Sequence, residues 1–165
     1  MNLGLAPTAR LCEGRAVSST SANTLAPGKI KLGLFGLSVA LFVVSLTLDA
    51  YYVDAPNPKA WSASLGLLLI GWIGVLTGIL AWLANPLLAI AWALFLLKLD
   101  LLSAIASVLA AVTAASFLRE TSIMVSEAPT YAKITGHGPG YWLWLSSTLV
   151  MIAAACWPPM RMRKR

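Results

Sequence analysis

The feature that most constrains this chain is an apolar segment from Leu65 to Leu118, whose 54 residues include only two charges, Lys98 and Asp100. A soluble domain of this size has too little interior to bury so much continuous apolar chain. Across the whole sequence 59% of the residues are hydrophobic and 11% are charged, whereas soluble domains average about 45–50% and about 25%. The sequence therefore predicts a small integral membrane protein whose helices have lipid as their solvent.

The net charge of +6 is concentrated near the two ends of the chain. Four basic residues precede the first apolar segment and four more lie in the last five positions: Arg10, Arg15, Lys29, Lys31, Arg161, Arg163, Lys164 and Arg165. Basic residues that flank apolar segments are typical of the cytoplasmic side of a membrane protein. No surface of interleaved basic and aromatic residues accompanies them, so nucleic acid is not an expected partner.

Apolar runs separated by polar stretches predict the fold class, an all-α integral membrane protein with a four-helix transmembrane bundle in residues 29–165. The expected spans are about 32–48, 63–83, 99–118 and 141–157. Residues 1–28 are rich in Ser, Thr, Ala and Pro, and we expect a disordered cytoplasmic tail there. Both termini then lie in the cytoplasm of a cell (inner) membrane, together with Lys98, so that nine of the twelve Lys and Arg residues are inside.

The segment from residue 87 to residue 118 is too long for one span. As a single helix it would measure about 48 Å, against a hydrocarbon core of about 30 Å. We expect a break at residues 98–100, which leaves one span and a short re-entrant or interfacial helix at 87–97. Asp100 would then lie in a first helical turn, where the helix dipole favours a carboxylate. A single long helix over 87–118 remains the alternative.

Small residues recur at helical spacing in the two central spans. Gly74 and Gly78 form a GxxxG pair with Gly71 near the same face, and a second stripe follows in the third span: Ser103, Ser107, Ala111 and Ala115. Such stripes let helix backbones approach closely in a membrane. They predict that the second and third spans pack together within one chain, with a dimer contact as the alternative.

Lys98 and Asp100 are the candidate functional charges, because an ionisable residue inside a membrane is a functional hypothesis by default. Their spacing of two residues does not place them face to face on a helix. Lys98 is either a buried coupling residue of a transporter or a lysine that extends to the interface. We expect the interfacial arrangement.

The second polar loop supplies the remaining candidates for interaction, Glu127, Lys133 and His137. His137 lies in a Gly-X-Gly-X-Gly sequence from Gly136 to Gly140, which lacks the strand and the Lys-Ser/Thr pair of a nucleotide-binding loop and indicates a turn. As the only histidine, it has few partners for a metal or catalytic site.

These observations predict a small bacterial-type membrane protein without a cofactor or metal. We expect it to be non-enzymatic and to act by binding, regulating or protecting another membrane component. Its partners would be the lipid bilayer and either another membrane protein or a second copy of itself. A small transporter or channel subunit that uses Lys98 and Asp100 is the alternative. A membrane enzyme would depend on His137 and the outer carboxylates alone.

Overall fold

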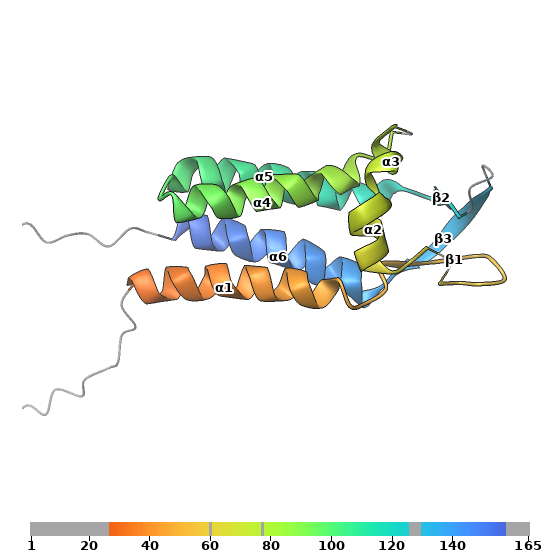
Figure 1. The fold of residues 1–165 in the computed structure, drawn as a ribbon, viewed down its shortest axis with the longest axis horizontal. Helices are drawn as coiled ribbons and strands as arrows, with labels where there is room; N and C mark the ends of the chain where they lie inside the picture. The colour runs from red at the N-terminus through yellow and green to blue at the C-terminus, as the bar shows by residue number, and fades with distance from the viewer. Residues whose placement is uncertain (1–26, 60, 77, 126–129, 158–165) are drawn as a thin grey trace, which may run out of the picture.

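The computed structural model describes residues 27–157, apart from residues 60, 77 and 126–129. The expected tail therefore lies outside the described residues up to residue 26, and residues 27 and 28 already belong to the first helix. Four helical rods lie side by side, with a small sheet beyond one end (Figure 1). The rods are α1 (Pro27–Ser45), η1 with α4 (Leu80–Leu83 and Ala84–Leu96), α5 with η2 (Asp100–Ser116 and Phe117–Arg119) and α6 (Pro139–Cys156).

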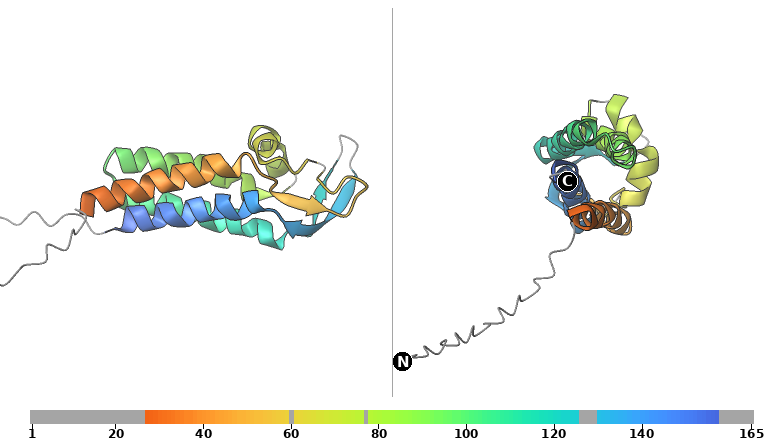
Figure 2. Two further views of the ribbon diagram at one scale, coloured as in Figure 1. Left: turned by 90° about the horizontal axis from the view of Figure 1, so that it is seen from below. Right: turned by 90° about the vertical axis from the view of Figure 1, so that its left-hand side faces the viewer.

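The rods form a ring when viewed along their axes (Figure 2). α1 packs on α6, α6 on α5 and α5 on α4. Aromatic side chains close the remaining side, where the Phe35 and Phe95 rings stack at 5.0 Å and Phe42 meets Trp92 edge-on at 5.3 Å. The buried core between the rods is built mainly of small and aliphatic side chains: Leu88, Ala91, Phe95, Ala106, Ala110, Met151 and Ala154.

The described residues are mostly helical, and three helical segments among them are long and apolar enough to cross a membrane: Gly28–Ser45, Asp100–Arg119 and Pro139–Cys156. They lie within a few residues of three of the four expected spans. The remaining rod, Leu80–Leu96, is also apolar but has only 17 residues. This part of the sequence prediction is therefore confirmed at the level of helix length and composition.

The expected second span, 63–83, is wrong, because these residues do not form one helix. They form α2 (Ser64–Ile70), α3 (Trp72–Leu76) and η1, and α2 lies across the end of the rods (Figure 1). α3 ends because Gly78 has a φ of +95°, with hydrogen bonds from the Ile79 amide to the Gly74 carbonyl and from the Gly78 amide to the Val75 carbonyl. This is the Schellman arrangement of a helix C-terminus.

The fourth rod is instead built from η1 and α4, which include most of the expected short helix at 87–97. That helix is not separate from the bundle, since it runs alongside α5 (Figure 1). Pro86 does not interrupt it, because it lies in the first turn of α4, where a missing amide proton costs no hydrogen bond. Pro86 therefore marks the start of α4.

The expected break at residues 98–100 is confirmed, since α4 ends at Leu96 and α5 begins at Asp100. Lys98 has a φ of +61°. The Leu99 amide donates to the Leu94 carbonyl at 2.9 Å, and the Lys98 amide donates to the Phe95 carbonyl at 2.9 Å. α4 thus also ends in a Schellman arrangement, with a lysine where glycine is usual. We call this end of the rods, where α1 starts and α6 stops, the turn end.

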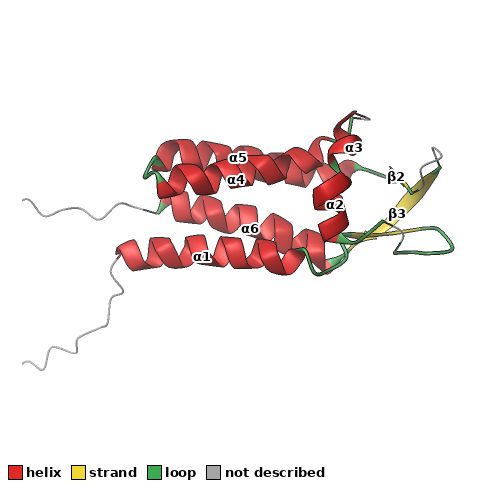
Figure 3. Cartoon of the chain, in the orientation of Figure 1, coloured by secondary structure: helices red, strands yellow, loops and turns green. Residues whose placement is uncertain are grey.

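The opposite end of the described bundle carries a three-stranded sheet, so the all-α expectation needs correction (Figure 3). β1 (Tyr51–Val53) and β2 (Ser122–Met124) both pair antiparallel with the central strand β3 (Tyr131–His137). β3 contains tyrosine, isoleucine and threonine and alternates in burial, both of which suit a strand. Such short strands in polar loops carry a weaker signal than the apolar helices. We call this end the sheet end.

Candidate functional site

The segment Leu48–Ala50 is separated from the end of α1 by two residues and pairs with two other segments at the sheet end. On one side the Ala50 amide donates to the Ser62 carbonyl at 2.8 Å. On the other side the amides of Gly138 and Gly140 donate to the carbonyls of Ala50 and Asp49 at 2.8 and 2.9 Å. This junction therefore fixes the end of α1 against the starts of both α2 and α6.

The glycines before and within α6 allow this close approach. A Cβ atom on Gly140 would lie 2.6 Å from Ser64 Oγ and 2.8 Å from the Asp49 carbonyl oxygen, and one on Gly138 would overlap the same carbonyl. Gly138 and Gly140 are thus explained by close packing at the junction, whereas a Cβ on Gly136 would meet nothing within 4 Å. The expected turn is wrong, because Gly136 lies in β3 and Gly140 in α6, so a strand does precede the helix. The segment still lacks the Lys-Ser/Thr pair of a phosphate-binding loop.

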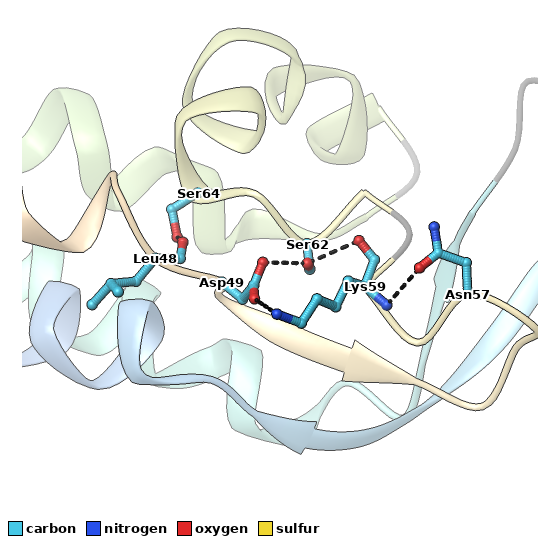
Figure 4. Close-up of polar contacts among 6 residues, drawn as sticks. All are labelled: Leu48, Asp49, Asn57, Lys59, Ser62 and Ser64. Carbon is cyan, nitrogen blue, oxygen red and sulfur yellow. Dashed lines mark hydrogen bonds and ion pairs between the residues drawn. The ribbon is translucent and has the colours of Figure 1, made fainter.

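A polar cluster stabilises the loop on the exposed side of the junction (Figure 4). The Ser62 hydroxyl donates to Asp49 Oδ1 at 2.8 Å, and Lys59 Nζ lies 3.0 Å from Asp49 Oδ2. These hydrogen bonds, that from Ser62 first, hold the pKa of the Asp49 carboxyl below its ordinary value of 3.8. The Asn57 side chain accepts a bond from the Lys59 amide at 3.2 Å and so orders the same turn.

A pocket of about 430 Å³ lies beside this junction. Its walls come from α2, α3, η1, η2, the sheet and the first turns of α6, and they are mainly aliphatic and aromatic. Tyr51, Leu67, Trp82, Tyr141 and Trp144 supply much of the surface. The volume lies in the range of about 300–1,000 Å³ that is usual for small-molecule sites. We call it the sheet-end pocket.

The polar atoms of the aromatic walls have partners within the chain. The hydroxyl of Tyr51 donates to the Trp61 carbonyl at 2.8 Å, and burial raises the pKa of this phenol to about 12. The hydroxyl of Tyr141 donates to the Ala114 carbonyl at 3.2 Å, and Trp144 Nε1 donates to Asn85 Oδ1 at 2.9 Å. These rings therefore present carbon surface to the pocket.

One side of the sheet-end pocket is covered by α2 and α3, residues 64–76, which we call the cover segment. None of the residues in its two helices is buried, although most are apolar. Trp82 Nε1 donates to the Leu68 carbonyl at 3.0 Å, and the indole passes so close to Gly71 that a Cβ there would lie 2.7 Å from Trp82 Cδ1. Gly71 therefore allows the close packing of Trp82, and it lies between α2 and α3 instead of within one helix stripe.

The GxxxG pair does not have the packing role that was expected. Gly74 and Gly78 do not share a helix face, because α3 ends at Leu76 and Gly78 terminates it. The stripe lies on α5, which packs against α4, α6 and η1, so residues 80–83 of the expected second span do pack on the third. Ser103, Ser107 and Ala111 are buried and Ala115 is half-buried, and Ser103 Oγ donates to the Ala91 carbonyl at 2.9 Å.

The candidate charges lie at the turn end, far from the pocket along the rods. Lys98 is exposed at the turn between α4 and α5. Asp100 pairs with Lys31 of α1 at 2.5 Å and not with Lys98. The Lys31 ammonium also lies 5.3 Å from the centre of the Phe95 ring. The structure thus separates the two residues that the sequence analysis considered together.

Of the three outer-loop candidates, Glu127 lies outside the described residues. Lys133 is exposed on β3, where its carbonyl accepts a bond from the Asp54 amide at 2.8 Å. His137 is held among the rings of Phe117, Tyr141 and Trp142, and its Nε2 atom is buried without a hydrogen-bond partner. The structure does not bring Lys133 and His137 into one site.

Sequence reasoning missed the pocket, the cover segment and the Asp49 cluster. Within the described ranges, His, Cys, Asp and Glu side chains form no group of three that could hold a metal. In comparisons with known proteins, no family model, curated protein or solved structure matches the chain.

Proposed function

We propose that this chain is a four-span protein of the cell (inner) membrane that binds another membrane component at its sheet end and does not act as an enzyme. The length of the fourth rod supports four spans. Its 13 α-helical and four 3₁₀ residues measure about 27 Å at rises of about 1.5 and 2.0 Å per residue, close to a hydrocarbon core of about 30 Å.

The exposed surface of the rods supports a lipid environment. Large apolar side chains are exposed along α1, α4, α5 and α6, for example Val43, Leu96, Leu101 and Leu149. Soluble monomers rarely expose apolar patches of more than a few hundred Å². In a bilayer this surface is solvated by acyl chains.

Charge supports an orientation with the turn end in the cytoplasm. The turn end carries Lys29, Lys31 and Lys98, and the chain beyond α1 and α6 adds six more basic residues, which makes nine of twelve. The sheet end carries the other three, Lys59, Arg119 and Lys133. The positive-inside rule then places the sheet on the opposite side of the membrane.

The single observation that carries the proposed function is the sheet-end pocket. The aromatic contacts of Phe35 and Phe42 join α1 to α4 along the rods, whereas at the sheet end the space beside η1 is left as a pocket under the cover segment. Pockets between helices of bundles are common binding sites. The transporter alternative has less support, because Lys98 is exposed at a turn and Asp100 is paired.

Site-specific photocrosslinking in living cells tests this proposal. Tyr131 is 60% exposed and borders the pocket, so Tyr131→benzoylphenylalanine places the probe at its mouth. We expect a discrete crosslinked species from position 131. The matched control is Lys133, exposed on the same strand but not in the pocket wall. Equal, diffuse labelling from both positions would refute a binding site here.

Cysteine labelling tests the orientation in a Cys12→Ala, Cys156→Ala background. Cysteines at positions 57 and 130 should react with an impermeant thiol reagent added to intact cells. A cysteine at position 162 should react only after permeabilisation. Labelling of position 162 from outside would reverse the proposed topology.

A further inference from the structure

We propose that the sheet-end pocket binds one hydrocarbon chain of a membrane lipid, which enters from the bilayer beneath the cover segment. The inference rests on the proposed function, since it names the membrane component that the sheet end binds.

The chemistry of the walls favours hydrocarbon over a polar ligand. Four aromatic residues of the wall direct their hydroxyl or indole N–H groups to carbonyls or to Asn85: Tyr51, Trp82, Tyr141 and Trp144. The remaining wall includes Leu67, Leu68 and Ile79. Water does not fill an apolar cavity, because it would find too few hydrogen-bond partners. A hydrocarbon chain requires no such partners and gains dispersion contacts on all sides.

The size of the pocket favours a lipid chain over a helix of another protein. A helix is about 10–12 Å wide and rises about 1.5 Å per residue, so that roughly three residues would fill the pocket. A hydrocarbon chain is about 4 Å across at van der Waals spacing and can occupy the same space along much of its length. Both occupants are apolar, but a lipid chain fits the volume of the pocket better than a helix does.

The cover segment supplies a route from the bilayer. Ile70 and Ile73 line the pocket, yet they are 40% and 41% exposed, so they form an edge between the pocket and the outer surface. On the outer face of α2, Leu69 is 67% exposed. A segment with apolar residues on both faces is suited to lie between the pocket and surrounding acyl chains.

The exposed residues at the opening of the pocket suit the headgroup of a lipid. Trp61 and Tyr131 line the pocket and are exposed beside the polar loop. Tryptophan and tyrosine are enriched at the depth of lipid headgroups. A lipid whose chain lies under the cover segment would thus keep its headgroup at the level of these two residues.

The test uses the full chain reconstituted in vesicles of phosphatidylethanolamine and phosphatidylglycerol. A trace of phosphatidylcholine carries a photoactivatable diazirine near the end of one acyl chain. After illumination, labelled peptides are mapped by mass spectrometry. We expect labelling of pocket residues in the segments 64–82 and 140–145.

Two substitutions on α2 form a matched pair. Leu67→Trp fills the pocket, whereas Leu69→Trp places the same side chain on the exposed face. We expect Leu67→Trp to lose most of the pocket labelling and Leu69→Trp to retain it. Ile123→Trp fills the pocket from β2 and repeats the test should Leu67→Trp fail to fold.

The outcomes separate this inference from the proposed function. Labelling that is equal in the Leu67→Trp and Leu69→Trp proteins would come from surrounding lipid and would overturn the inference. Capture of a protein from position 131, without acyl labelling of the pocket, would overturn it while leaving the proposed binding function intact. Loss of both signals would remove both proposals.

Discussion

Lys31 of α1 and Asp100 of α5 form an ion pair across the turn end, between helices that are not direct neighbours in the ring. The Lys31 and Asp100 side chains are 17% and 38% exposed. The pair therefore lies at the boundary of the bundle, where a lysine can place its stem on apolar surface and its ammonium among polar groups. In this arrangement Asp100 serves the positioning of α1 and also lies in the first turn of α5.

The first prediction is that this ion pair contributes little to stability. Partly exposed pairs are typically worth about 0–1 kcal/mol. A double-mutant cycle with Lys31→Met and Asp100→Asn, measured by thermal unfolding in mild detergent, should give a coupling energy of no more than about 1 kcal/mol. A coupling of several kcal/mol would indicate that the pair is buried in the membrane core.

The second prediction concerns the backbone at Lys98. A non-glycine residue with left-handed φ costs about 1–2 kcal/mol, so Lys98→Gly should stabilise the protein by about 1 kcal/mol, the gain expected where glycine ends a helix. Lys98→Ala keeps the strain and is the control. Lys98→Arg should be silent in folding and topology. A Lys98→Gly protein that unfolds more readily than the Lys98→Ala protein would contradict this account.

The third prediction concerns Ser38, which is fully buried and joins three rods. Its hydroxyl donates to the Ser147 carbonyl of α6 at 2.8 Å and accepts from Trp92 Nε1 of α4 at 3.1 Å. Ser38→Ala should cost about 1–2 kcal/mol, because the indole N–H loses its partner. Ser147→Ala keeps the backbone carbonyl and should cost less. Equal unfolding temperatures for the two variants would argue against this network.

The fourth prediction is a pH dependence at the sheet end. Since the pKa of Asp49 is lowered in the folded protein, the contact with Ser62 and Lys59 stabilises the fold above the ordinary value of 3.8. This stabilisation should be lost as the pH falls below 3.8, through the folded pKa. Unfolding measured at several pH values between neutrality and acid should show a smaller decline for Asp49→Asn than for the natural chain. An equal loss of stability with falling pH in both proteins would contradict this role of Asp49.

The helices that could be anticipated from the sequence are those with a uniform apolar run and clear polar limits. The expected spans 32–48, 99–118 and 141–157 match α1, α5 and α6 within a few residues. The break at Lys98 was also predictable, because a helix over 87–118 would exceed the thickness of a bilayer.

The cover segment and the pocket could not be anticipated in this way. Residues 64–76 are as apolar as a membrane span. Local features keep them from forming one long helix: the left-handed turn at Gly78 and the approach of Trp82 to Gly71. The Asp49 cluster depends on a turn that returns Lys59 to the end of α1. The pocket combines residues from across the described chain, whose proximity no periodicity indicates.

The pairing of α1 with α6 also has a consequence for biogenesis. Ser38 and its partner Ser147 are 109 positions apart. At a synthesis rate of about 5–20 residues per second, roughly 5–20 seconds separate the emergence of these two residues from the ribosome. During that interval the first helix can contact α4 through aromatic side chains and pair with Asp100 of α5, but it lacks the helix with which it shares its most extensive interface. A nascent chain of this kind is exposed to capture by membrane quality control until its last helix is inserted.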